Sequence, residues 1–257
     1  MEAGLLRDAL VVLLGVITGM LSAAFGVGGA VLSTPGVRVL GVSALVAVGT
    51  TLPSILPSAA SGTARYWREG LVDWGVVATV APAGAVAAVA GSLLAGEVPG
   101  NGHWLMVMTA LLLGLTAVRL IREPEERETA PPDRRSVPVR LGLGAAGGLM
   151  SGLLGVGGGV ILLPAFLQLL RLPTKEAVAT SLACVGIFAL PGTITHAFLG
   201  DIDWRFAILL IVGVVPGARL GAAVALRAND RRLRLAVATV MGVLAVVYGV
   251  SELRSVL

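Results

Sequence analysis

The chain has 257 residues, of which 56% are hydrophobic and 13% are charged, and its mean hydropathy is +0.92. A soluble globular domain carries about 25% charged residues and a disordered chain carries more, so both classes are excluded. Aromatic residues make up only 4% whereas glycine occurs 35 times, a composition typical of transmembrane helices packed through small side chains.

The first half of the chain predicts five helical segments. A glycine turn, Gly26-Val-Gly-Gly29, interrupts the first apolar stretch. The expected helices cover about 9–25, 29–40, 44–64, 72–94 and 104–120. The helix after the glycine turn is about 18 Å long, whereas the hydrocarbon core of a bilayer is about 30 Å thick. This helix is therefore too short to cross the membrane.

A polar segment follows at 119–140. It contains eleven charged residues and four of the 13 prolines in the chain. Such a segment does not enter lipid, so we interpret it as a linker. The predicted domains are a first membrane repeat over 1–118, this charged cytoplasmic linker over 119–140, and a second membrane repeat over 141–257.

The second half repeats the first. Gly19, Ser22 and Pro35 have identical partners 129 positions later, and Asp73 and Trp74 have identical partners 130 positions later. Composition alone would not bring serine, proline, aspartate and tryptophan into register, so we infer an internal duplication. The corresponding helices are expected over 141–154, 158–170, 176–198, 204–226 and 233–251.

Two topologies are compatible with these segments. If each glycine turn is a kink within one span, lysine and arginine divide 11 to 7 between the two sides, with Arg219 left out because it lies inside a span. If each turn is the tip of a hairpin, they divide 14 to 4. The positive-inside rule favours the second division. We therefore predict an all-α polytopic membrane protein with two inverted repeats, each a broken-helix hairpin plus three transmembrane helices.

In that arrangement the two glycine turns meet near the membrane midplane and point two helix N-termini into the protein, where anions bind favourably. Hydroxyl side chains and Arg219 are candidates to assist. The predicted substrate-binding residues are Ser22, Gly26, Gly28, Gly29, Ala30, Thr50, Thr51, Ser151, Gly155, Gly157, Gly158, Gly159, Thr180, Ser181 and Arg219. Three alternatives stay open: the glycines only permit tight packing, the hydroxyls bond their own helices, and Arg219 extends to the membrane surface.

Other partners and activities are less well supported. The basic pI near 10.2 reflects loops between apolar runs and not a nucleic-acid surface. Cys184, His103 and His196 form no metal-binding cluster, so no cofactor or metal is expected. Ser151 and His196 have the residue types of an intramembrane serine protease, but nothing orients a base, so no enzyme is predicted. A homo-oligomer and a non-transporting membrane scaffold remain open.

Several motifs together resemble the TauE/SafE sulfite exporter family. They are Leu154-Gly-Val-Gly-Gly-Gly-Val-Ile-Leu-Leu-Pro164, Ala179-Thr-Ser-Leu182, Gly200-Asp-Ile-Asp203 and Pro216-Gly-Ala-Arg-Leu-Gly221. The resemblance implies a multi-pass transporter of the bacterial inner membrane that exports sulfite or a small organosulfur anion. We predict that it works by alternating access around the midplane site. Uptake of another small oxyanion is the alternative. The first copy departs from the motif at Ala30, where the second has Gly159.

Overall fold

The fold is taken from a computed structural model that describes residues 2–97, 107, 108, 110, 111, 113–115, 117, 118, 136–155 and 157–256. The predicted linker lies outside the described residues over 119–135, as does part of the helix expected at 104–120. Within the described residues all regular secondary structure is helical, which confirms the all-α prediction.

The helices correspond to the predicted segments, although the first begins earlier than the predicted residue 9 and the last extends beyond the predicted 233–251 at both ends. In the first half they are α1 (Glu2–Phe25), α2 (Ala30–Val39), α3 (Ala44–Arg68) and α4 (Trp74–Ala95). In the second half they are α6 (Val137–Leu154), α7 (Gly159–Gln168), α8 (Thr174–Leu199), α9 (Trp204–Arg227) and α10 (Asp230–Val256). Six of these, α1, α3, α4, α6, α8 and α9, are long and apolar enough to cross a membrane.

The start of α6 differs from the prediction. This helix begins at Val137, inside the segment assigned to the linker, and not at residue 141. Ser136 occupies the N-cap position and Pro138 lies in the first turn. Proline is tolerated there because the first backbone N–H groups of a helix have no intrahelical partner.

Each glycine turn is the tip of a hairpin and not a kink. A Cβ atom added to Gly36 of α2 would lie 2.5 Å from the side chain of Leu14 in α1, so α2 runs back along α1. A Cβ atom added to Gly147 of α6 would lie 3.1 Å from Leu162 of α7, which places α7 back along α6. The chain therefore returns toward the end from which it came in both halves.

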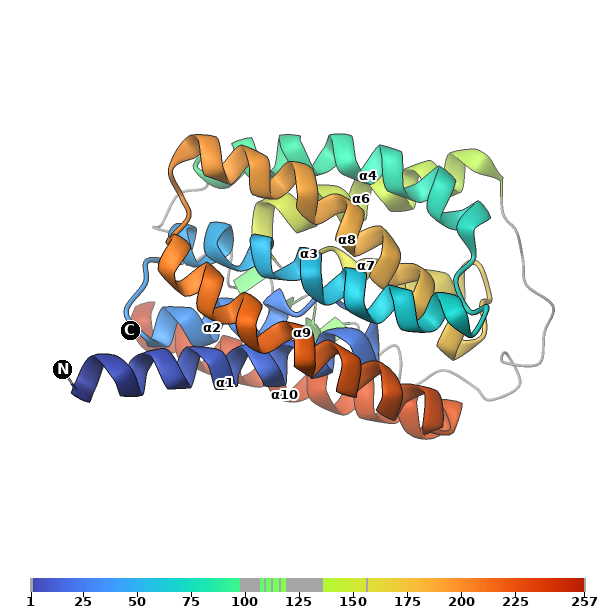
Figure 1. The fold of residues 1–257 in the computed structure, drawn as a ribbon. Helices are drawn as coiled ribbons and strands as arrows, with labels where there is room; N and C mark the ends of the chain where they lie inside the picture. The colour runs from blue at the N-terminus through green and yellow to red at the C-terminus, as the bar shows by residue number, and fades with distance from the viewer. Residues whose placement is uncertain are drawn as a thin grey trace.

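Glycines hold two pairs of long helices in close contact. A side chain at Gly19 in α1 would clash with the backbone of Val214 in α9, and a side chain at Gly148 in α6 would clash with the backbone of Gly84 in α4. These two pairs are equivalent, because α6 is the counterpart of α1 and α4 is the counterpart of α9 in the two repeats. Between these pairs lie α3 and α8 (Figure 1).

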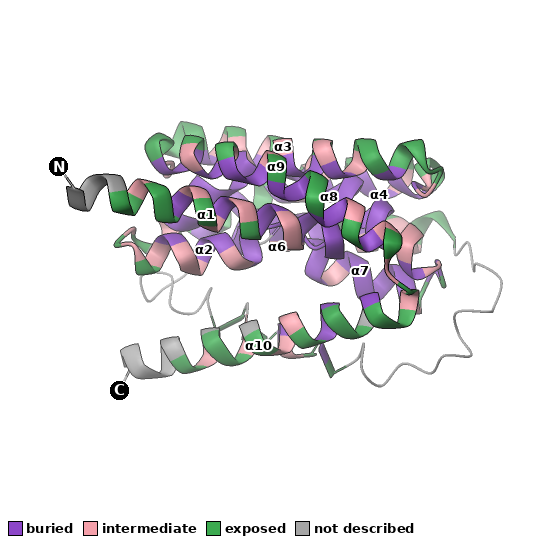
Figure 2. Cartoon of the chain, turned by 60° about the horizontal axis from the view of Figure 1, so that its bottom comes forward, coloured by how far each residue is buried: buried purple, intermediate pink, exposed green. Residues whose placement is uncertain are grey.

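The equivalent helices α3 and α8 are antiparallel. Gly62 near the end of α3 faces Leu182 near the start of α8, and Gly192 of α8 faces Leu52 of α3. Buried residues fill the centre of the molecule, whereas the outward faces are exposed (Figure 2). Many of the exposed residues are large and apolar, such as Leu13 on α1 and Phe198 on α8. These outward faces suit a hydrocarbon environment.

Candidate functional site

The two glycine turns meet at the centre of the molecule, as the sequence predicts. A Cβ atom added to Gly157 would lie 3.3 Å from the Cα atom of Gly28. The same atom would lie 3.3 Å from Ile55 and 3.0 Å from Val185. Ile55 and Val185 are equivalent residues halfway along α3 and α8, so the turns meet at mid-length of the two central helices.

Left-handed backbone explains why these turns need glycine. Gly26 and Gly28 have φ values of 66° and 80°, and Gly155, Gly157 and Gly158 have φ values of 64°, 88° and 69°. Residues with a Cβ atom rarely adopt such values. The turns are not identical, because Gly29, the counterpart of Gly158, has a φ of −63°.

The departure of the first copy at Ala30 has a steric reason. A Cβ atom at Gly159 would lie 2.5 Å from the carbonyl oxygen of Gly26 and 2.6 Å from Val27, so the second turn has no room for a side chain there. Ala30 begins α2 and is fully buried. The two turns therefore touch asymmetrically, with the second turn seated against the backbone of the first.

The helices that start at these turns have no side-chain caps. Gly29 and Gly158 are the N-cap residues of α2 and α7, and neither first turn contains an acidic residue. By contrast, the carboxylates of Asp73 and Asp203 accept hydrogen bonds from the first turns of α4 and α9. Helix N-termini without a carboxylate can accept an external anion.

Two equivalent serines lie buried beside the turns. Ser22 is 1% exposed and Ser151 is fully buried, and the hydroxyl oxygen of neither has a hydrogen-bond partner. A buried hydroxyl without a partner destabilises the fold. Thr63, Ser92 and Thr193 also lack a partner, so the feature that distinguishes Ser22 and Ser151 is their position beside the turns. Thr18, which the sequence analysis missed, is also buried without a partner and contacts Gly29. Its position four residues before Ser22, on the same helix face, is the signal that could have identified it.

The other predicted hydroxyls have structural partners. The backbone N–H of Asp203 donates to Thr50 at 2.8 Å, and the backbone N–H of Asp73 donates to Thr180 at 3.0 Å. These equivalent bonds join α3 to the start of α9 and α8 to the start of α4.

Thr51 and Ser181 are equivalent positions with different partners. Thr51 donates to the Val48 carbonyl at 3.1 Å and lies 3.1 Å from the hydroxyl of Thr34 in α2. Ser181 donates to the carbonyl of Gly26 at 2.7 Å. Ser181 of the second half therefore holds the glycine turn of the first half.

Tyr66 and His196 make equivalent contacts in the two halves. The Tyr66 hydroxyl donates to the carbonyl of Ala23 at 2.7 Å, and Nε2 of His196 lies 3.3 Å from the carbonyl of Gly152. Nδ1 of His196 lies 3.2 Å from the carboxylate of Asp201. Nε2 of His196 thus contacts the carbonyl of Gly152, and no hydrogen bond joins His196 to the hydroxyl of Ser151.

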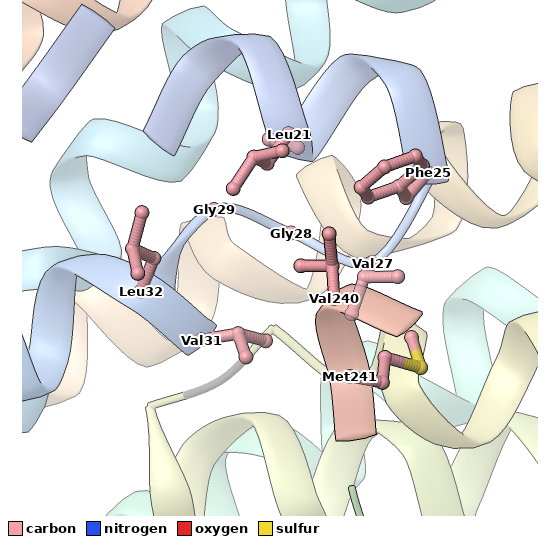
Figure 3. A pocket seen from close by; sticks show the side chains of 10 residues that line it. Leu21, Phe25, Val27, Gly28, Gly29, Val31, Leu32, Val240 and Met241 are labelled. Atoms are coloured by element: carbon pink, nitrogen blue, oxygen red, sulfur yellow. The ribbon is translucent and has the colours of Figure 1, made fainter. Parts of the chain in front are cut away.

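A small cavity lies beside the first turn (Figure 3). Its volume is about 20 Å³, and Ser22 provides the only polar side chain among the described residues that line it. The lining residues are Leu21, Ser22, Phe25, Val27, Gly28, Gly29, Val31 and Leu32 from the first hairpin, with Val240 and Met241 from α10. A cavity of this size holds about one water molecule, so a larger ligand requires the turns to separate.

Arg219 does not lie at the glycine turns. Its side chain is exposed and lines a separate cavity with Arg65 and Arg68. No residue is shared by this cavity and the one beside the first turn. The structure thus assembles the glycines and serines of the predicted site, but it places this arginine elsewhere.

The structure combines apolar helices that could cross a membrane with two broken-helix hairpins whose tips meet at the centre. This combination is typical of polytopic membrane proteins built like secondary transporters. The family model of the sulfite exporter TauE/SafE matches residues 11–248, so the chain belongs to this family.

Similar proteins from other organisms are named as probable membrane transporters. A probable membrane transporter protein of Xylella fastidiosa is 29% identical, and the alignment covers 83% of each chain. The probable membrane transporter protein YunE of Bacillus subtilis is 26% identical over 84% of this chain and 87% of its own. A probable membrane transporter protein of Methanocaldococcus jannaschii is 22% identical over 93% and 94%. No solved structure matches the chain significantly. These findings identify a multi-pass membrane transporter and support the predicted bacterial inner-membrane location.

Proposed function

We propose that this protein exports sulfite, or a small organosulfur anion such as a sulfonate, by alternating access around the two glycine turns. The observation that carries the proposal is the pair of equivalent buried hydroxyls, Ser22 and Ser151, which lie beside the turns without partners. An oxyanion would accept hydrogen bonds from these hydroxyls and from the backbone at Gly28–Ala30 and Gly157–Gly159.

The proposed topology is that of inverted repeats, with 1–118 and 141–257 on either side of a cytoplasmic linker at 119–140. The antiparallel packing of α3 and α8 supports it. So does the charge distribution: Arg65 and Arg68 end α3 at the end of the molecule where α8 starts, and Lys175 in the first turn of α8 binds the carbonyl of Leu226 near the end of α9. An excess of basic residues at one end is typical of the cytoplasmic side.

Transport requires the two hairpins to move relative to α3 and α8, because the space beside the first turn is too small for an oxyanion. The membrane potential supplies a driving force in this proposal. In a cell that is negative inside, outward movement of one negative charge is favoured by about 2.3 kcal/mol per 100 mV. None of the described helix centres contains an aspartate or glutamate that would serve as a proton relay.

The serines provide a test that leaves the fold intact. Ser22→Ala combined with Ser151→Ala should lower sulfite efflux from proteoliposomes at least about tenfold, which corresponds to roughly 1.4 kcal/mol of lost stabilisation. The thermal midpoint should be unchanged or higher, because the substitutions remove hydroxyls that have no partner.

Ser92→Ala is the matched control, because Ser92 is another buried serine without a partner but lies on α4 against Gly152. Its efflux should equal that of the wild type. Wild-type efflux from the double variant would contradict the site. A membrane potential can be imposed with a potassium gradient and valinomycin. An efflux rate that does not change with this potential would contradict the proposed driving force.

A further inference from the structure

A second cavity, larger than the first, lies between the last turns of α3 and the middle of α9. Its volume is about 480 Å³. Three small residues of α3, Ala60, Ser61 and Ala64, leave the space, and three arginines, Arg65, Arg68 and Arg219, complete its lining. We call it the arginine cavity.

The three guanidinium groups lie at the same level of the molecule. At the end of the molecule opposite the arginine cavity, the hydrogen bond between Asp203 and Thr50 places the start of α9 beside the first turns of α3. Arg65 and Arg219 follow these two residues by 15 and 16 positions on helices that run in the same direction. Arg219 therefore stands beside the last turns of α3 although it lies eight residues before the end of α9.

No carboxylate neutralises this cluster within the described part of the chain. Ion pairs there include those of Lys175 with Asp230, His196 with Asp201, and Arg205 with Asp8, and none is found for Arg65, Arg68 or Arg219. Three unpaired arginines around one cavity produce a positive potential that attracts an anion, and the planar guanidinium group suits the oxygens of phosphate or a related oxyanion.

The other repeat shows what this surface faces. The residues that correspond to the lining of the arginine cavity are mostly apolar and partly or largely exposed: Val89, Leu190, Pro191, Ile194, Thr195 and Phe198. Phe198, which corresponds to Arg68, is 89% exposed. An apolar side chain exposed to this degree at the end of a membrane helix suits contact with lipid. The arginine cavity occupies the corresponding surface at the opposite end of the molecule.

Two tryptophans mark the depth of the cavity. Trp67 and Trp74 flank the loop between α3 and α4, are 62% and 46% exposed, and contact each other edge to face at 5.8 Å. Exposed tryptophan is typical of the headgroup region. Trp67 adjoins Arg68, so the arginines lie at the level of lipid phosphates.

We propose that the arginine cavity binds an oxyanion carried by lipid, namely the phosphate of an anionic phospholipid headgroup in the leaflet on the linker side. Basic cavities between transmembrane helices on the cytoplasmic side bind such headgroups. The site is distinct from the glycine turns, since the two cavities share no residue. It depends on the chain being a membrane protein and not on which solute is transported.

The test uses the purified full chain and phosphatidylglycerol or cardiolipin, with phosphatidylcholine for comparison. Native mass spectrometry should show the anionic lipid bound at defined stoichiometry. Arg65→Gln combined with Arg68→Gln and Arg219→Gln should weaken this binding at least about tenfold. A charge-matched control, Arg171→Gln with Arg227→Gln and Arg232→Gln, removes three exposed arginines outside the cavity and should keep the binding.

Free oxyanions form the second arm. Inorganic phosphate, sulfate and sulfite are added to the protein in phosphatidylcholine nanodiscs, and the thermal midpoint is measured. We expect the cavity arginines to cause little change, because acyl chains hold the phosphate of a lipid beside the cavity, whereas a dissolved ion binds only from dilute solution. Two results together would contradict lipid as the source of the oxyanion. Free oxyanions would stabilise the wild type but not the cavity variant, and the wild type would show no preference for anionic lipid. Equal loss of lipid in both triple variants would overturn the site.

Discussion

The contacts of Tyr66 and His196 show how single residues stabilise the broken helices. Both side chains are fully buried, and each contacts a carbonyl in the last turns of the helix that precedes a glycine turn. One is a phenol that donates a hydrogen bond, and the other is an imidazole that also reaches Asp201. The first half thus achieves with a hydroxyl what the second half achieves with a ring nitrogen.

Substitution of His196 separates the hydrogen bond from the packing. His196→Tyr gives the second half the side chain that Tyr66 provides in the first half, and it keeps a hydrogen-bond donor for the Gly152 carbonyl. His196→Phe has similar size without the donor. We expect His196→Phe to be less stable than His196→Tyr by about 1 kcal/mol, measured by thermal unfolding in detergent. Equal stability of the two variants would show that the contact with Gly152 has no energetic role.

At the scale of helices, close approach through glycine determines the packing. The backbones of α6 and α4 lie so near each other that no Cβ atom fits at Gly148, whereas Gly142 on the same helix has no atom within 4 Å of such a Cβ. Membrane helices pack through contacts of this kind because lipid supplies no hydrophobic force between them.

Gly148→Ala and Gly142→Ala form a matched pair. Gly148→Ala should lower the thermal midpoint, since α6 must move away from α4 or strain its backbone. Gly142→Ala should leave the midpoint unchanged or raise it, since alanine favours a helix over glycine by roughly 1 kcal/mol. If both variants respond alike, backbone approach at Gly148 does not hold the two helices together.

The sequence predicts the elements better than it predicts their contacts. Hydropathy and segment length locate the long helices, and the shortness of the segment after each glycine turn indicates a hairpin. The duplication also predicts that the two turns meet, because equivalent hairpins that enter from opposite ends of the molecule bring their tips to its centre. These features depend on residues that are close in sequence or repeated.

The partners of individual side chains depend on helices that are distant in sequence. Thr50 bonds to Asp203, which is 153 positions away, so its structural role does not follow from the residues around it. Arg219 lies within an apolar helix, but its neighbours in the cavity, Arg65 and Arg68, come from the end of α3. The structure places Ser22 and Ser151 beside the turns and Arg219 beside Arg65 and Arg68, and substrate binding by these residues stays a prediction.

At the scale of the whole molecule, the proposed topology assigns each end to one side of the membrane. Glu69 follows α3 at the basic end, and Arg205 lies at the start of α9 at the other end. Both residues are exposed. Single cysteines at these positions, in a chain with Cys184→Ala, can be labelled in whole cells with a maleimide that does not cross membranes.

We expect Arg205→Cys to react from outside the cell and Glu69→Cys to react only after the membrane is permeabilised. Cys184 is fully buried, so its replacement should not alter the labelling pattern. The reverse pattern would invert the orientation, and labelling of both from outside would contradict the assignment of the two ends to opposite sides.

Hydrogen exchange of the glycine-turn amides tests the central claim most directly. The protein in phosphatidylcholine nanodiscs is compared with and without sulfite, using the Ser22→Ala and Ser151→Ala double variant as the control. Sulfite should slow exchange in the wild type over 26–32 and 155–161, since an oxyanion bound there accepts hydrogen bonds from these backbones. The double variant should show a smaller effect at the same concentration. Unchanged exchange at both turns, at a sulfite concentration that supports transport, would contradict the account.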